Sequence, residues 1–117
     1  MAKMTMVQAL NLALQQEMEK DDRVIVLGED VGVDGGVFRV TDGLIDRFGG
    51  ERVLDTPLAE NGIVGMSIGM AVYGLKPVCE IQFSGFSYQN FHQIENHAAR
   101  LRWRSLSLIH ISEPTRR

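Results

Sequence analysis

A continuous apolar run from Val24 to Leu27 constrains the fold of this chain more than any other feature. The run contains no polar residue, and Gly28 ends it. A strand with one solvated face would alternate apolar and polar residues, so an unbroken run indicates a strand that is buried on both faces. Strands of this kind are typical of parallel sheets that carry helices on both sides.

The segments around this strand alternate between helix and strand signals. A capping box, with Thr5 as the cap and Gln8 three residues later, predicts a helix that ends near Lys20. We expect further helices at 41–48, 61–73 and 88–103, further strands at 52–54 and 78–83, and a glycine-rich loop at 31–36. Because such alternation favours parallel pairing, the predicted fold class is α/β, a parallel sheet with helices on both faces.

Size and composition narrow the possible functions. The 117 residues, 44% of them apolar, suffice for one small domain with a packed core. The net charge of −3 argues against a nucleic-acid-binding protein, and no apolar run reaches the roughly 18 residues that a membrane span requires. A single cysteine, Cys79, cannot form an internal disulfide, so a reducing compartment and a cytoplasmic location are expected.

Polar segments follow all three expected strands, at 28–30, 55–62 and 82–86. Ligands bind beyond the carboxyl ends of parallel strands, so we expect these segments to line one crevice. Glu60 is the leading candidate there, because it precedes an expected helix whose dipole favours a carboxylate. Spacing alone supports a helix-capping acid better than a catalytic one, and Glu29 could be a solvated acid that ends a strand.

Other residue types give weaker signals. His92 and His97 lie in one expected helix without a second ligand pair at metal spacing, so they are interpreted as surface or interface residues, and no metal site is expected. Cys79 falls within an expected strand and is interpreted as an inert buried thiol. The glycines at 32–36 lack the lysine of a phosphate-binding loop.

The end of the sequence differs from the rest. Residues 106–117 follow Ser105 without recognisable turn chemistry and resemble the translation of an adapter used to prepare sequencing libraries. We therefore expect a partial domain at 1–105 and no domain at 106–117. The alternative is a genuine short strand and tail.

Four runs, taken in order, carry a resemblance to a known family. They are Leu27–Val31, Gly36–Phe38, Arg52–Glu60 and Glu80–Phe83. They resemble the beta subunit of the thiamine-diphosphate-dependent decarboxylating component of 2-oxo acid dehydrogenase complexes, with a pyruvate-dehydrogenase-like pattern at 84–90. The resemblance implies a pyrimidine-type, transketolase-like thiamine-diphosphate-binding fold. The fold would be incomplete here, because the family continues well past Ser105.

The resemblance also implies roles for individual residues. Glu60 matches the catalytic glutamate, which hydrogen-bonds the aminopyrimidine ring of the cofactor and promotes its activation. Glu29 matches a supporting glutamate near the cofactor and the subunit contact. Four further residues match positions near the pyrimidine ring: Leu58, Gln82, Phe86 and Gln89. Magnesium and the diphosphate are expected to be held mainly by a separate alpha subunit.

Several partners and alternatives follow from the resemblance. The expected partners are an alpha subunit, in a heterotetramer of two alpha and two beta chains, a dihydrolipoyl acyltransferase core and a small 2-oxo acid, with no nucleic acid and no membrane. A branched-chain 2-oxo acid or acetoin dehydrogenase is an alternative to pyruvate dehydrogenase. A transketolase-like enzyme would use the same glutamate chemistry. A non-catalytic alternative is a truncated chain that is not stable in isolation.

Overall fold

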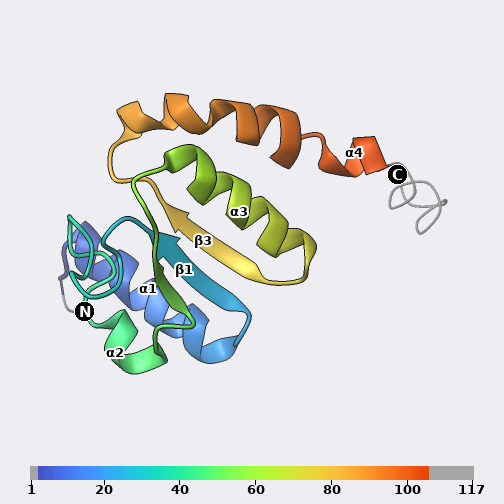
Figure 1. The fold of residues 1–117 in the computed structure, drawn as a ribbon. Coiled ribbons are helices and arrows are strands. Elements are labelled where there is room, and N and C mark those ends of the chain that lie inside the picture. The colour runs from blue at the N-terminus through green and yellow to red at the C-terminus, as the bar shows by residue number, and fades with distance from the viewer. Residues whose placement is uncertain (1–2, 106–117) are drawn as a thin grey trace.

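The computed structural model describes residues 3–105 of the chain (Figure 1). Segment 106–117, where no domain is expected, lies outside the described residues. Three strands form one sheet: β1 (Val24–Gly28), β2 (Val53–Asp55) and β3 (Lys76–Glu80). All pairing is parallel and the strand order is β2-β1-β3, which confirms the predicted parallel sheet.

The central strand is β1, and all five of its residues are buried, as the unbroken apolar run predicts. The register places Gly28 beside Asp55 on one side and Glu80 on the other. All three strands therefore end at the same level. The segments that follow them begin together at one edge of the sheet.

Helices cover both faces of the sheet, as predicted (Figure 1). On one face lie α1 (Met6–Lys20) and α2 (Leu44–Phe48), and on the other lies α3 (Glu60–Val72). The core between the sheet and the first two helices consists of Met18, Val24, Val26, Val31, Leu44 and Val53. None of the helices in residues 3–105 is long and apolar enough to cross a membrane.

The predicted start of α1 is confirmed in its hydrogen bonds. The Gln8 backbone N–H donates to Thr5 Oγ1 at 3.1 Å, and the Thr5 backbone N–H donates to Gln8 Oε1 at 2.9 Å. Each partner thus satisfies a backbone donor that the first turn of a helix leaves free. The helix ends at Lys20, where the sequence predicts its end.

Several element boundaries differ from the sequence prediction: β2 and α3 are each shifted by one residue, and β3 and α2 differ by more. The prediction of a strand at 78–83 is wrong at both ends, because β3 begins at Lys76 and ends at Glu80. The Lys76 backbone N–H donates to Arg23 O at 2.9 Å. Pairing with β1 sets these limits, and an exposed lysine followed by proline gives no local strand signal. The prediction of a helix from residue 41 is also too long, since α2 begins at Leu44.

The long helix predicted at 88–103 is three shorter pieces. A 3₁₀ segment, η1 (Ser84–Asn90), is followed by a π-helical segment, η2 (Gln93–Ala98), and by α4 (Leu101–Ser105). The Ala99 backbone N–H donates to Ile94 O at 2.9 Å, five residues back, which widens the turn. A Cβ at Gly65 of α3 would lie 3.4 Å from Gln93 Cδ, so packing on α3 accompanies the local departure from an α-helix.

Candidate functional site

Two buried glutamates lie at the carboxyl end of the central strand. Glu29 follows β1 directly, and Glu60 is the first residue of α3. Their exposed fractions are 5% and 4%, and they lie close enough for Glu60 to raise the pKa of Glu29. Ala59, which precedes α3, has no side chain that can cap the helix. A buried carboxyl pair therefore lies where the polar segments after β1 and β2 meet, with Glu60 within the first turn of the helix rather than before it.

Burial and the neighbouring acid favour the protonated form of Glu29. Burial raises the pKa of Glu29 to about 7, and the neighbouring Glu60 acts in the same direction. The charges of Asp30 and Glu80 raise the pKa of Glu29 further. Glu29 thus retains a proton up to near-neutral pH, while its Oε1 atom is buried without a hydrogen-bond partner among the described residues.

A third acid, Glu80, lies beside this pair. It ends β3 next to Gly28, and burial raises its pKa. Its Oε2 atom is buried and has no hydrogen-bond partner within residues 3–105. The strands approach closely here, since a Cβ at Gly28 would lie 2.9 Å from Val31 Cγ1 and 3.0 Å from Glu80 O. Glycine at this position therefore allows the ends of β1 and β3 to approach closely.

The end of β2 supports a loop instead of joining the carboxyl pair. Asp55 Oδ1 accepts a hydrogen bond from the Gly32 backbone N–H at 2.7 Å. At the other end of the same loop, Asn11 Nδ2 donates to Val40 O at 2.7 Å and to Asp42 O at 3.0 Å. The loop 31–40 is thus held by β2 at its start and by α1 at its end.

Gln82 contacts Glu29, and three aromatic rings lie next to Gln82 along the chain or in contact with its neighbour Phe83. Gln82 Nε2 donates to Glu29 O at 3.3 Å, which brings the chain after β3 against the chain after β1. Phe83 contacts Phe86 edge to face, with ring centroids 5.4 Å apart, and contacts Phe38 in the same way at 5.4 Å. These rings are about one third to one half exposed, so an apolar wall stands open to a ligand or partner.

The structure brings together only some of the expected site residues. Glu29, Glu60 and Gln82 meet, and Phe86 lies in the adjoining row of rings. Leu58 is 80% exposed in the segment between β2 and α3, and Gln89 is exposed in η1. No contact of either residue with the carboxyl pair is seen in the described part of the chain.

Sequence reasoning missed three residues near the site. Glu80 was expected inside a strand at 78–83 and entered only the resemblance, whereas it is the last residue of β3. Phe38 and Phe83 gave no local signal, because the contact between their rings joins distant parts of the chain. Within loop 31–40, residues 31–36 were expected only as a glycine-rich loop.

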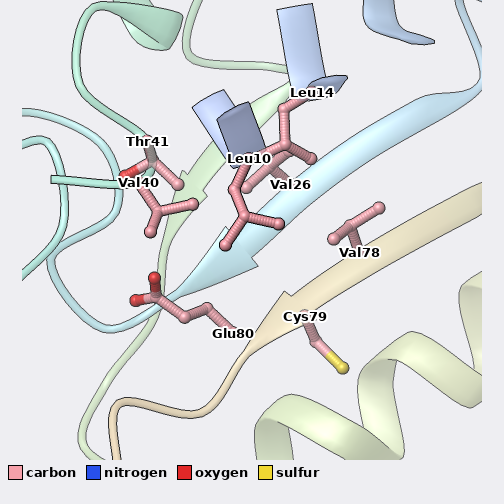
Figure 2. Close-up of a pocket in the computed structure, with 8 residues that line it drawn as sticks. All are labelled: Leu10, Leu14, Val26, Val40, Thr41, Val78, Cys79 and Glu80. Carbon is pink, nitrogen blue, oxygen red and sulfur yellow. The ribbon is translucent and has the colours of Figure 1, made fainter. Parts of the chain in front are cut away.

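A separate cavity of about 310 Å³ lies on the α1 side of β1 and β3 (Figure 2). Its lining is mainly apolar and consists of Leu10, Leu14, Val26, Val40, Thr41, Val78, Cys79 and Glu80. Neither Glu29 nor Glu60 contributes to it. In Figure 2 the sulfur of Cys79, which is half-buried, points away from the neighbouring side chains and toward the helix on the other face. Because its lining is mainly apolar, the cavity is better suited to packing against another apolar surface than to acid–base chemistry.

The two histidines form a small cluster of their own. The rings of His92 and His97 lie edge to face, 5.2 Å between centroids, and Asn96 Nδ2 is 2.8 Å from His92 Nδ1. Among residues 3–105 there is no group of three or more histidine, cysteine, aspartate or glutamate side chains that could hold a metal ion.

Two curated relatives are similar over most of this chain. The pyruvate dehydrogenase E1 component subunit beta of Staphylococcus epidermidis is 59% identical over 105 residues, which is 90% of this chain and 32% of the relative. The 3-methyl-2-oxobutanoate dehydrogenase subunit beta of Mycobacterium tuberculosis is 57% identical over 102 residues, 87% of this chain and 29% of the relative. The chain thus spans about a third of the length of these relatives.

The fold also agrees with a family model. Residues 2–113 match the model described as "Transketolase, pyrimidine binding domain". This match covers nearly the whole chain and includes all three strands and both glutamates. The chain belongs to the family of transketolase-like pyrimidine-binding domains.

Proposed function

We propose that this chain is part of the beta subunit of a thiamine-diphosphate-dependent 2-oxo acid dehydrogenase, pyruvate dehydrogenase. The whole enzyme would decarboxylate a 2-oxo acid and transfer the acyl group to a lipoyl domain. The observation that carries the proposal is the buried pair of Glu29 and Glu60 at the carboxyl end of a parallel sheet, where Glu60 raises the pKa of Glu29. The names of the similar proteins support the reaction class.

The residues present fit the pyrimidine half of thiamine diphosphate. An aminopyrimidine ring is flat and apolar on its faces, and its edge carries hydrogen-bonding nitrogen atoms. Glu60 offers a buried carboxyl group, and the buried Oε1 atom of Glu29 can still accept a hydrogen bond. Phe86, 36% exposed, leaves part of its ring available for stacking.

In the proposed mechanism Glu60 would hold its carboxyl group against a ring nitrogen of the bound cofactor and would share its carboxyl proton with that nitrogen. Such a positioned acid–base group contributes about 10² to 10⁴ in rate. Glu29 retains its proton up to near-neutral pH. The pair therefore does not carry two negative charges. The cofactor itself supplies the electron sink for decarboxylation.

The remainder of the proposed enzyme lies on other chains or segments. We assign magnesium and the diphosphate mainly to an alpha subunit, in an assembly of two alpha and two beta chains. A dihydrolipoyl acyltransferase core would receive the acyl group. The similarity to a protein named as the beta subunit of an E1 component supports this arrangement.

Which 2-oxo acid the enzyme prefers is a separate part of the proposal. We favour pyruvate because residues 84–90 resemble pyruvate dehydrogenases. The similarity to the Mycobacterium tuberculosis protein keeps 3-methyl-2-oxobutanoate as the alternative. Comparison of kcat/KM for the two acids decides between them, and a higher value for the branched acid would overturn the assignment to pyruvate.

The test of the proposal uses a hybrid subunit, in which residues 1–105 replace the matching segment of the Staphylococcus epidermidis relative, assembled into its E1 component. We expect Glu60→Gln to lower the decarboxylation rate about 10²- to 10⁴-fold. Binding of thiamine diphosphate, measured by calorimetry, should change less. The matched control is Glu51→Gln, because Glu51 is an exposed glutamate outside the site. Near-normal turnover in Glu60→Gln would contradict the proposed role.

A further inference from the structure

A row of three phenylalanine rings leads from a surface loop to η1, the segment that follows Gln82 and Phe83. Phe83 stands in the middle and contacts Phe38 and Phe86 edge to face, both at 5.4 Å, with interplanar angles of 79° and 78°. The three rings come from loop 31–40, from the segment after β3 and from η1. Offset perpendicular contacts at this distance are the favourable geometry for aromatic pairs.

The outer end of the row is firmly supported. Phe38 is followed by Arg39, which has a positive φ of 67°. Two glycines shortly before Phe38, Gly35 and Gly36, have φ of 76° and 85°. The Gly36 backbone N–H donates to Asp30 O at 2.8 Å, and the Arg39 backbone N–H donates to Gly36 O at 3.2 Å. These turns, together with the anchors at both ends of the loop, fix the backbone that carries the Phe38 ring.

The inner end of the row has less support of its own. Phe86 lies in η1, a 3₁₀ segment, and its backbone N–H donates to Phe83 O at 2.9 Å. Segments of this type have poorer hydrogen-bond geometry than α-helices. The Phe86 side chain is also 36% exposed, so surrounding packing alone does not fix its ring.

We propose that Phe83 and Phe38 are positioning residues that hold the Phe86 ring in the orientation in which it stacks on a flat heteroaromatic ligand. This inference rests on the proposed function and deepens it, because the ligand is the pyrimidine ring of the cofactor. Phe83 packs against the Phe86 ring, and Phe38 packs against Phe83. The rigid loop 31–40 thereby sets the geometry of a ring that belongs to another segment.

The experiment measures the dissociation constant of thiamine diphosphate in the assembled hybrid enzyme by calorimetry. Phe86→Leu removes the stacking ring and should weaken binding about tenfold. Phe83→Leu should weaken it about 3- to 10-fold and Phe38→Leu about twofold, because each loses an edge contact. In the double variant Phe83→Leu/Phe86→Leu, binding should be no weaker than in Phe86→Leu, since Phe83 acts through the Phe86 ring.

Controls separate positioning from simple loss of structure. Phe83→Tyr keeps the ring and should restore binding. Tyr88→Leu removes an aromatic ring from the same 3₁₀ segment, where Tyr88 is 85% exposed and takes part in none of the ring contacts among the described residues. It should leave the dissociation constant unchanged. With saturating cofactor, kcat should recover in Phe83→Leu and Phe38→Leu, which a merely unfolded fraction would not allow.

The outcomes distinguish this inference from the function on which it rests. Additive losses in the double variant, or equal binding in Phe83→Leu and Tyr88→Leu, would overturn the positioning role while the stacking role of Phe86 stands. If Phe86→Leu binds thiamine diphosphate normally, both the stacking assignment and the inference are wrong. If Phe83→Leu does not assemble, Phe38→Leu in the exposed loop decides, and unchanged binding there overturns the proposal.

Discussion

At the residue scale, the carboxyl pair is the feature with the largest chemical consequence. Glu29 is almost completely removed from water and lies against a second acid, so its charged form is disfavoured. Its usual pKa is near 4.5 and rises to about 7 in the folded chain. The pair thus remains protonated at a pH at which a solvated glutamate is ionised.

The raised pKa predicts how stability changes with pH. Below about pH 4.5 Glu29 is protonated in both states, whereas between about 4.5 and 7 the unfolded chain releases a proton that the folded chain retains. The folded state then binds more protons, so its stability falls as the pH rises through this window. Glu29→Gln mimics the protonated acid and should flatten the fall.

Urea unfolding of the hybrid subunit at pH 5 and pH 8 tests this prediction. The stability of Glu29→Gln relative to the parent should be higher at pH 8 than at pH 5, while the exposed control Glu51→Gln should show no such gain. Glu80, whose pKa is also raised by burial, contributes a residual slope of the same sign. An equal difference at both pH values would show that Glu29 is ionised in the folded subunit.

The positions of the site residues could be predicted from the sequence where the end of a strand determines them. The end of the apolar run placed Glu29 at the carboxyl edge, and the second polar segment placed Glu60 near a helix start. Spacing alone could not show that the two side chains are buried together, because that depends on the order in which the strands pair. For Leu58, 80% exposed in the described chain, the assignment rests on the resemblance alone.

At the element scale, local chemistry determined where sequence prediction succeeded. Helix α1 was predicted to the residue because its capping box and apolar spacing are both local signals. Strand β3 and the segments after it were less accurate, since their limits depend on pairing with β1 and packing on α3. The π-helical η2 has no local signal in an otherwise helical pattern.

The burial of α1 predicts a difference between two methionines of the same helix. Met18 is fully buried in the core beneath the sheet, whereas Met6 in the first turn is 75% exposed. Met18→Ala should lower the free energy of unfolding by about 2–5 kcal/mol through lost burial and the cavity left behind. Met6→Ala, the matched control, should change it by less than about 0.5 kcal/mol.

Urea unfolding of the hybrid subunit also measures this difference. A shift of the midpoint at constant slope for Met18→Ala would indicate a pure change in stability. Equal effects of the two substitutions would show that α1 does not pack on the sheet through Met18.

At the scale of the whole molecule, much apolar surface remains uncovered within residues 3–105. Helix α3 carries apolar residues around most of its circumference, and Val72 and Tyr73 at its end are 60% and 94% exposed. Strand β3 is an edge of the described sheet, with Val78 42% exposed and the apolar cavity of Figure 2 beside it. Parallel sheets are normally covered on both faces, so these surfaces are suited to burial against more protein.

The 117-residue chain expressed alone should therefore self-associate and bind thiamine diphosphate weakly. A domain is stable by only about 5–15 kcal/mol, and the exposed apolar area both removes part of that margin and favours association. Sedimentation velocity over a range of concentrations should show species larger than a monomer. Val72→Lys places a charge on the uncovered end of α3 and should reduce association, whereas Val33→Lys, at an 83% exposed valine of loop 31–40, should have little effect. A monomeric sample with one cooperative thermal transition and tight cofactor binding would show instead that this chain is a self-sufficient domain, and that the surfaces of α3 and β3 need no cover.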